Sequence, residues 1–172
     1  IYWKEMQTIM DWSKNNVTSV FHICWGAQAA LYHHFGIQKH PLEKKMFGVF
    51  PHTVTDRNEP LLRGFDDIFT APHSRHTGIS IQDIDKNPQV KLLSASLDAG
   101  VYIVMSTDRR MIFVTGHSEY DPNTLADEYF RECVVGHHTV PAQPARFTDI
   151  PGELALQLRT GLEAQGFHKL YT

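Results

Sequence analysis

The stretch that decides the fold is Val17-Thr-Ser-Val-Phe-His-Ile-Cys-Trp-Gly-Ala-Gln-Ala-Ala-Leu-Tyr-His-His34. Its first part, residues 17–23, is β-branched and aromatic and predicts a buried strand. The Ala-rich part, residues 24–34, predicts a helix that ends at Gly36. A strand that runs into a helix with almost no loop is typical of a βα unit, so we expect a mixed α/β fold.

Hydrophobic periodicity and turn residues predict the remaining elements. An amphipathic helix is predicted over residues 1–14, and a second helix over 123–132 with Asn123 as its N-cap. Predicted strands lie at 45–50, 52–54, 67–71 (ending at Pro72), 90–95, 101–105 and 111–115, with a turn region at 60–65. Beyond these we expect an irregular Pro/Ala-rich stretch at 140–146 and a short helix at 153–164.

Composition excludes several classes of function. The chain has 172 residues, with 16 Lys and Arg against 19 Asp and Glu, a net charge of −3 and a hydrophobic content of 42%. This length supports one domain with a real core. No apolar run approaches the roughly 18 residues of a membrane span, and no basic stripe indicates a nucleic-acid site. We therefore expect a cytoplasmic globular protein with neither a membrane nor a nucleic acid as its partner.

The 2 cysteines and 11 histidines are the candidate reactive groups. Cys24 and Cys133 provide neither a disulfide framework nor a zinc spacing. The histidine pairs at 33–34 and 137–138, and the run His73-Ser-Arg-His76, lack cysteine or acidic partners at ligand spacing. We therefore expect no metal site.

The position of Cys24 supports two interpretations. At a helix N-terminus, unpaired N–H groups and the helix dipole favour a thiolate nucleophile. The Trp25 amide would then point to where a tetrahedral oxyanion forms, and Gly26 would permit close backbone approach in a sharp turn. The alternative is a small buried thiol at the end of a strand, since free cysteines are often buried.

A nucleophilic cysteine needs a base and a group that orients the base. His117-Ser-Glu119 follows the predicted strand at 111–115. Side chains at positions i and i+2 of an extended segment lie on the same side, so the Glu119 carboxylate can support one ring nitrogen while the other faces a thiol. The alternative is that His117 is an ordinary surface histidine.

Two motifs together indicate a family. Cys24-Trp-Gly-Ala-Gln28 resembles the C-x-G-x-Q motif of class I glutamine amidotransferases, and His117-Ser-Glu119 resembles their H-x-E partner. The surrounding sequence is similar to homoserine O-acyltransferases of the homoserine O-succinyltransferase family, from residue 1 to about residue 132. The matching segments are 22–30, 71–75, 113–121 and 128–131.

This resemblance implies a flavodoxin-like three-layer α/β sandwich of the class I glutamine amidotransferase type. It also implies an acyltransferase of methionine biosynthesis, which moves a succinyl or acetyl group from acyl-coenzyme A to the hydroxyl of homoserine. Cys24 would carry the acyl group as a thioester. His117 would be the general base, and Glu119 would orient it.

The family's substrate-binding positions match Lys45, Ser74 and Arg131. An arginine fork suits the carboxylate of homoserine. The resemblance implies acyl-coenzyme A as a co-substrate and no bound cofactor, and a homodimer is a candidate assembly.

Chains of this family are considerably longer than 172 residues. We therefore expect residues 1–132 to form a partial acyltransferase domain without its N-terminal strands, and residues 133–172 to be an unassigned C-terminal segment. Two alternatives stay open: a glutamine amidotransferase-type hydrolase, and a fragment of the acyltransferase that cannot turn over. His22 argues against the first, because amidotransferases usually have a glycine there.

Overall fold

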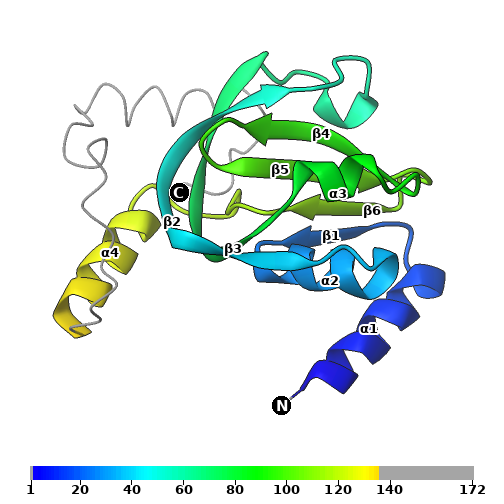
Figure 1. Ribbon diagram of the computed structural model, residues 1–172, viewed down its shortest axis with the longest axis horizontal. Coiled ribbons are helices and arrows are strands. Elements are labelled where there is room, and N and C mark those ends of the chain that lie inside the picture. Colours follow the sequence, from blue (N-terminus) through cyan, green and yellow to red (C-terminus); the bar gives the residue numbers. More distant parts are fainter. Residues whose placement is uncertain (1, 136–172) are drawn as a thin grey trace.

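A computed structural model of the protein describes residues 2–135 (Figure 1). The irregular stretch predicted at 140–146 and the helix predicted at 153–164 lie outside these residues. The helices are α1 (Trp3–Asn16), α2 (Trp25–Phe35), α3 (Ile81–Asp85) and α4 (Thr124–Val135), with a short 3-10 helix, η1, at Pro60–Leu62. The strands are β1 (Val20–Ile23), β2 (Lys39–Val54), β3 (Ile68–Ile79), β4 (Val90–Ser96), β5 (Gly100–Ser106) and β6 (Met111–Val114).

The strands form one six-stranded sheet in the order β1-β6-β5-β4-β2-β3. Only β1 and β6 pair in parallel, with Ile23 opposite Val114, and every other pair is antiparallel. The carboxyl ends of two neighbouring parallel strands meet at the same edge of a sheet. The residues after β1 and the residues after β6 are therefore delivered to one place, although about ninety positions separate them in the sequence.

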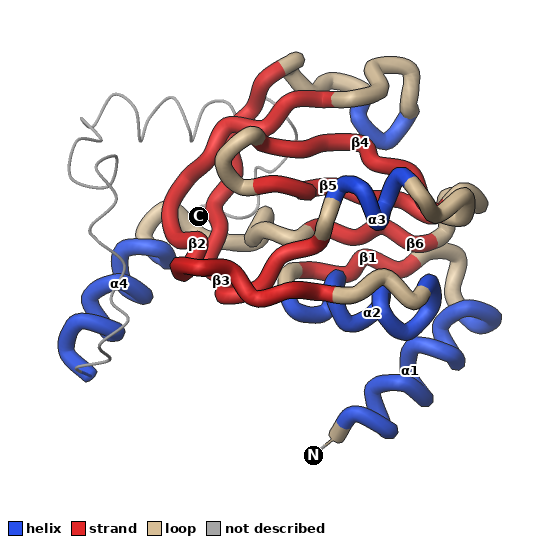
Figure 2. Tube along the Cα trace, in the orientation of Figure 1, coloured by secondary structure: helices blue, strands red, loops and turns tan. Residues whose placement is uncertain are grey.

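Strands β2 and β3 form a long pair that curls away from the rest of the sheet (Figure 2). The two short strands predicted at 45–50 and 52–54 are parts of the single strand β2. The prediction that a strand ends at Pro72 is wrong, because β3 continues through Pro72 to Ile79. Pro72 is tolerated since β3 is an edge strand, and the side that lacks an N–H faces away from β2.

Hydrophobic clusters lie on both faces of the sheet. On one face, α1, α2 and α3 pack against residues of β4, β5 and β6, among them Phe113 of β6. Ala27, Ala30 and Leu31 of α2 are completely buried there, and their mostly small side chains let the helix lie close to the sheet. On the other face, Leu62 and Phe65 from the β2–β3 connection and Phe69 of β3 contribute to the second cluster.

The end of α2 follows the sequence prediction. Gly36 adopts the left-handed conformation, with φ of 69°, and its N–H donates to the Tyr32 carbonyl at 2.9 Å, the bond of an αL C-cap. Figure 1 shows α1 and α4 at opposite ends of the molecule, with α4 beside the curled β2–β3 pair. Within residues 2–135, none of the helices has the length and apolar character that a membrane crossing requires.

Candidate active site

Cys24 occupies a sharp turn between β1 and α2. Its backbone has φ of 49° and ψ of −115°, which non-glycine residues rarely adopt and which costs of order 1–3 kcal/mol. Hydrogen bonds fix the turn on both sides: the Cys24 N–H donates to the Val114 carbonyl at 2.7 Å, and the Gln28 N–H donates to the Cys24 carbonyl at 3.2 Å. The thiol is partly exposed. This geometry favours the nucleophile over the buried core thiol.

Trp25 is the first residue of α2, so its N–H has no acceptor within the helix. That amide is available beside the thiol. The Trp25 ring is half-exposed and lies edge-on to Trp3, with ring centroids 6.5 Å apart. Gly26 was expected to let another backbone segment approach closely. Among the described residues no segment does so, because a Cβ added at Gly26 would meet nothing within 4 Å.

His117 lies directly after β6, at the sheet edge that Cys24 shares. Its Nδ1 is 2.7 Å from Oε1 of Glu119, and the Cys24 thiol also acts on the charge of its ring. Burial by itself lowers the pKa of His117, but the hydrogen bonds with Cys24 and Glu119 outweigh it and raise the pKa to about 9. The described structure therefore places the Cys24 turn, the His117 imidazole and the Glu119 carboxylate at one edge of the sheet.

The loop that carries His117 is anchored to the edge strand β3. The His117 N–H donates to the Pro72 carbonyl at 2.9 Å, on the side of Pro72 that has no N–H of its own. Gly116 makes this contact possible. A Cβ there would lie 2.7 Å from the Pro72 oxygen and 2.8 Å from the Tyr102 ring, so no larger residue fits without movement.

Three side chains converge on the carboxylate of Glu128 in α4. Lys45 Nζ lies 3.1 Å from Oε1, the Ser74 hydroxyl donates to the same oxygen, and the Tyr120 hydroxyl donates to Oε2 at 2.9 Å. Burial raises the pKa of Glu128, but these three hydrogen bonds outweigh it and hold the pKa below its usual range. The Lys45–Glu128 ion pair is nearly buried, with side-chain exposures of 5% and 14%.

The structure thus brings Lys45 and Ser74 together at the Glu128 carboxylate. Arg131 is exposed on α4, three residues after Glu128, and residues at that spacing lie on the same side of a helix. Sequence reasoning did not identify Glu128 or Tyr120 as members of the site. Segment 128–131 resembles the family, and the resemblance implies a role for Arg131 but none for Glu128, which lies nearly one turn earlier.

Behind this site lies a buried chain of polar side chains. His73 and His52 are completely buried, and their Nε2 atoms are 3.0 Å apart. Arg75 Nε donates to Nδ1 of His73 at 3.2 Å. The run His73-Ser-Arg-His76, considered for metal binding in the sequence, therefore contributes to a hydrogen-bonded network.

A second histidine group joins α1 to α2. Asp11 Oδ1 lies 2.8 Å from His33 Nε2, and the ligand atoms of Asp11, His33 and His34 all lie within 4.8 Å of one another. The acidic partner comes from a different helix, which spacing along the sequence could not reveal. The Lys14 charge acts on both Asp11 and His34 and opposes a cation there. The absence of a metal site stays a prediction.

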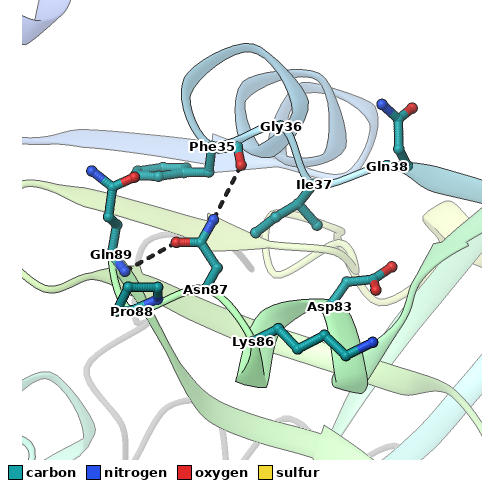
Figure 3. A pocket seen from close by; sticks show the side chains of 9 residues that line it. All are labelled: Phe35, Gly36, Ile37, Gln38, Asp83, Lys86, Asn87, Pro88 and Gln89. Atoms are coloured by element: carbon teal, nitrogen blue, oxygen red, sulfur yellow. Dashed lines mark hydrogen bonds between the residues drawn. The ribbon is translucent and has the colours of Figure 1, made fainter.

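A pocket of about 480 Å³ lies at the other end of α2 (Figure 3). It is lined by the end of that helix and by the turn between α3 and β4, where Asn87 Nδ2 donates to the Phe35 carbonyl at 3.1 Å. Since Cys24 precedes the first residue of α2 and Phe35 is its last, the length of this helix separates the pocket from the thiol.

Comparisons with known proteins agree with the motifs. The model of the homoserine O-succinyltransferase family matches residues 1–159. Homoserine O-acetyltransferase from Brevibacillus brevis is 62% identical over 135 residues, which are 78% of this chain and 44% of that protein. The corresponding enzyme from Acetivibrio thermocellus is 59% identical, with the same shares. The chain thus spans less than half the length of these two relatives.

Solved structures share the fold. A glutamine amidotransferase from Thermotoga maritima has a TM-score of 0.69 at 12% identity, covering 98% of this chain and 67% of that one. A second, from Methylobacillus flagellatus, has a TM-score of 0.67 at 15% identity, covering 96% and 68%. These comparisons confirm the α/β fold of the class I glutamine amidotransferase type.

Proposed function

Because this chain belongs to the homoserine O-succinyltransferase family, we propose that the protein to which it contributes transfers an acyl group from acyl-coenzyme A to homoserine. The observation that carries the proposal is the hydrogen bond between His117 Nδ1 and Glu119 Oε1, at the sheet edge that His117 shares with Cys24. This is the arrangement of an activated nucleophile, its base and the group that orients the base.

The first half-reaction acylates the thiol. With a pKa of about 9, His117 is protonated at neutral pH and stands beside Cys24 as an imidazolium. The Cys24 thiolate attacks the thioester carbonyl of acyl-coenzyme A, and the oxyanion that forms accepts a hydrogen bond from the Trp25 amide. The bond to coenzyme A breaks, and its sulfur takes the proton from His117. Coenzyme A leaves as a free thiol, and the acyl group stays on Cys24.

The second half-reaction needs a base, and acylation creates it. An acylated Cys24 no longer supports the charge on His117, so the pKa of His117 falls. Neutral His117 then takes the proton from the homoserine hydroxyl as the oxygen attacks the acyl-thioester. The C–S bond breaks, the ester product leaves, and the thiolate and imidazolium are restored.

Lys45, Ser74 and Arg131 form the proposed homoserine subsite. Arg131 supplies an exposed guanidinium for the carboxylate of the substrate. Glu128 is a positioning residue, because it holds Lys45 and Ser74 side by side and reaches the His117 region through Tyr120. The acceptor would then lie between α4 and the catalytic pair.

The relatives at about 60% identity are acetyltransferases by name, which supports acetyl-coenzyme A as the donor, with succinyl-coenzyme A as the comparison. No resident cofactor is needed for these steps. The proposal also includes a role in methionine biosynthesis, location in the cytoplasm and assembly as a homodimer. We also retain the division at residue 132, with 133–172 as a separate C-terminal segment.

The test is to incubate the complete protein with each acyl-coenzyme A in the absence of homoserine. Mass spectrometry of the peptide that contains Cys24 should find one acyl group, which added homoserine removes as its O-acyl ester. Cys24→Ser should not accumulate a thioester, and His117→Asn should slow both steps. A folded protein that stays unacylated with both donors would refute the proposal.

The amidotransferase-like fold supports a second candidate, hydrolysis of glutamine at the same thiol. Release of ammonia from glutamine, lost in Cys24→Ala and faster than any acyl transfer, would favour that candidate. A protein that performs neither reaction would support the third possibility, a chain that retains the motifs without turnover.

A further inference from the structure

The imidazole of His73 packs against the segment that carries His117. His73 is completely buried on β3, and a Cβ added at Gly116 would lie 3.0 Å from Cε1 of its ring. No space therefore separates the ring from the Gly116 main chain. Pro72, the residue before His73, accepts the hydrogen bond from the His117 N–H at 2.9 Å. Two consecutive residues of β3 thus hold the main chain from which His117 extends.

Contacts on every side fix the orientation of the His73 ring. Arg75 Nε donates to its Nδ1 at 3.2 Å, and its Nε2 lies 3.0 Å from Nε2 of His52. Three aromatic rings enclose it, those of Phe50, His52 and Tyr102, with centroids 5.8, 5.0 and 5.5 Å away. A ring that is bonded at both nitrogens cannot turn about its side-chain torsions without breaking both bonds.

The same contacts determine which nitrogen of each ring carries the proton. Arginine has only donors and keeps its charge in proteins, so His73 Nδ1 is an acceptor without a proton. The proton of neutral His73 is then on Nε2 and is donated to His52 Nε2, which leaves the proton of His52 on Nδ1. Burial and the charge of Arg75 both lower the pKa of His73, in agreement with a neutral ring.

This chain of hydrogen bonds continues to the turn of Cys24. Arg75 Nη1 donates to the Thr77 carbonyl at 2.7 Å, and Gln28 Nε2 donates to the same carbonyl at 3.0 Å. The Gln28 N–H in turn donates to the Cys24 carbonyl at 3.2 Å. Strand β3 therefore holds the turn of Cys24 at one point and, through His73 and Pro72, the segment of His117 at another.

Ser74, between His73 and Arg75, belongs to the other face of β3. Successive side chains of a strand point to opposite faces, and the Ser74 hydroxyl donates to Glu128. The contact of His73 with Gly116 is therefore separate from the proposed homoserine subsite, and the two can be distinguished in kinetic measurements.

We propose that His73 is a positioning residue, whose ring sets where His117 stands relative to Cys24. The inference rests on the proposed role of His117 as the base. His73 takes no proton in the reaction and acts through the main chain of Gly116. Because its ring has one tautomer and one orientation, it gives the base a fixed support.

The first measurement needs no substitution. Long-range correlation of ring hydrogens with ¹⁵N in NMR spectra of the complete protein distinguishes protonated from unprotonated ring nitrogens. At neutral pH, His73 should carry its proton on Nε2 and His52 should carry its proton on Nδ1. A proton on Nδ1 of His73 would break the chain from Arg75 and would overturn the inference.

The second measurement uses His73→Asn in the complete protein, which removes the ring from Gly116 and keeps an oxygen that can accept from Arg75. The His117 N–H should exchange with solvent about tenfold faster, by local opening, while the amides of β5 are unchanged. Misplacement of the base should lower kcat by about tenfold to a hundredfold. The KM for homoserine should change by less than about threefold, because Ser74 faces the other side.

His34→Asn is the matched control. It makes the same replacement at another partly buried histidine, near the far end of α2 from Cys24, whose Nε2 has no hydrogen-bond partner among residues 2–135. It should leave the exchange of His117 and both kinetic constants unchanged. If His73→Asn does not fold, His73→Gln keeps a donor for His52 and gives the same comparison.

Unchanged exchange at His117 in a folded His73 variant, or an equal effect in His34→Asn, would overturn the inference. So would a higher KM with an undiminished kcat, which would place the effect at Ser74. Acyl transfer with unchanged kcat and unchanged exchange rejects only the role of His73. Faster exchange at His117 in a protein that transfers no acyl group rejects only the proposed function.

Discussion

The ring of Tyr120 stacks on the ring of His117, with centroids 4.2 Å apart and an angle of 19° between the planes. The hydroxyl of the same tyrosine donates to Glu128 Oε2. One side chain therefore links the base beside Cys24 to the carboxylate that holds Lys45 and Ser74. The proposed catalytic pair and the proposed homoserine subsite are joined through Tyr120.

Two substitutions of Tyr120 separate these contacts. Tyr120→Phe keeps the stacked ring and loses the hydrogen bond to Glu128, so KM for homoserine should rise severalfold while kcat changes less than threefold. Tyr120→Ala removes both contacts and leaves the His117 ring less well positioned, so kcat should fall about tenfold or more, part of the roughly 10²–10⁴-fold that a positioned general base contributes. Steady-state kinetics with varied homoserine give both constants. Equal kcat losses in the two variants would show that the stacked ring does not position His117.

The pKa of His117 depends on both of its partners. In Cys24→Ala the hydrogen bond and charge of the thiol are gone, so the pKa of His117 should fall from about 9 toward or below its ordinary value. Glu119→Gln should lower it as well, because the carboxylate that stabilises the imidazolium becomes a neutral amide. NMR titration of the ring protons measures both shifts. A pKa of His117 that stays near 9 in Cys24→Ala would contradict the proposed thiolate–imidazolium pair.

Gly116 and Gly26 should respond to alanine with opposite signs. At Gly116 the new Cβ would lie 2.7 Å from the Pro72 oxygen, so we expect the free energy of unfolding to fall by about 1–3 kcal/mol. At Gly26, near the start of α2, the added Cβ meets nothing and alanine is the better helix former, which should add up to about 1 kcal/mol. Urea unfolding of the two variants provides the comparison. Equal stabilities would mean that the loop yields at Gly116.

The buried histidines should make the fold sensitive to mild acid. Burial lowers the pKa of His52 from 6.5 to about 4, so the unfolded chain binds more protons than the folded chain between these values. The free energy of unfolding is therefore unaffected by the titration of His52 above pH 6.5. It decreases as the pH falls from 6.5 toward 4, by at most about 3 kcal/mol in total. Urea midpoints measured from pH 7.5 to 5 should decline.

His52→Gln should flatten that decline, and the same replacement at His76, which is exposed, should leave it unchanged. A decline that is equally steep in both variants would place the acid sensitivity elsewhere. His73 shares the contact with His52, so some of the pH dependence remains after substitution of His52 alone.

The sequence allowed prediction of those parts of the site that local pattern determines. The βα turn at Cys24 follows from a β-branched run next to an Ala-rich helix, and the pairing of His117 with Glu119 follows from their two-residue spacing. The strand that passes through Pro72 was predicted to end there, because proline usually interrupts a strand. The edge position that permits it depends on the order of strands in space, which the sequence does not display.

The long-range contacts could not be predicted in this way. Glu128 meets Lys45 across 83 positions and Ser74 across 54, so no periodicity connects them. Arg75 presents a similar problem, since an arginine in a polar stretch is usually a surface residue. Its hydrogen-bond partners, two backbone carbonyls and a histidine, become evident only in the three-dimensional structure.

The left-handed backbone at Cys24 has a consequence for how this protein can evolve. Within residues 2–135, Cys24 and Arg109 are the two non-glycine residues with positive φ, and glycine would relieve the strain at either position. At Cys24, however, glycine would remove the reactive sulfur. A lineage that no longer needed the chemistry would therefore gain stability from the substitution that ends it, so retention of the cysteine is a sign of continued selection for reactivity.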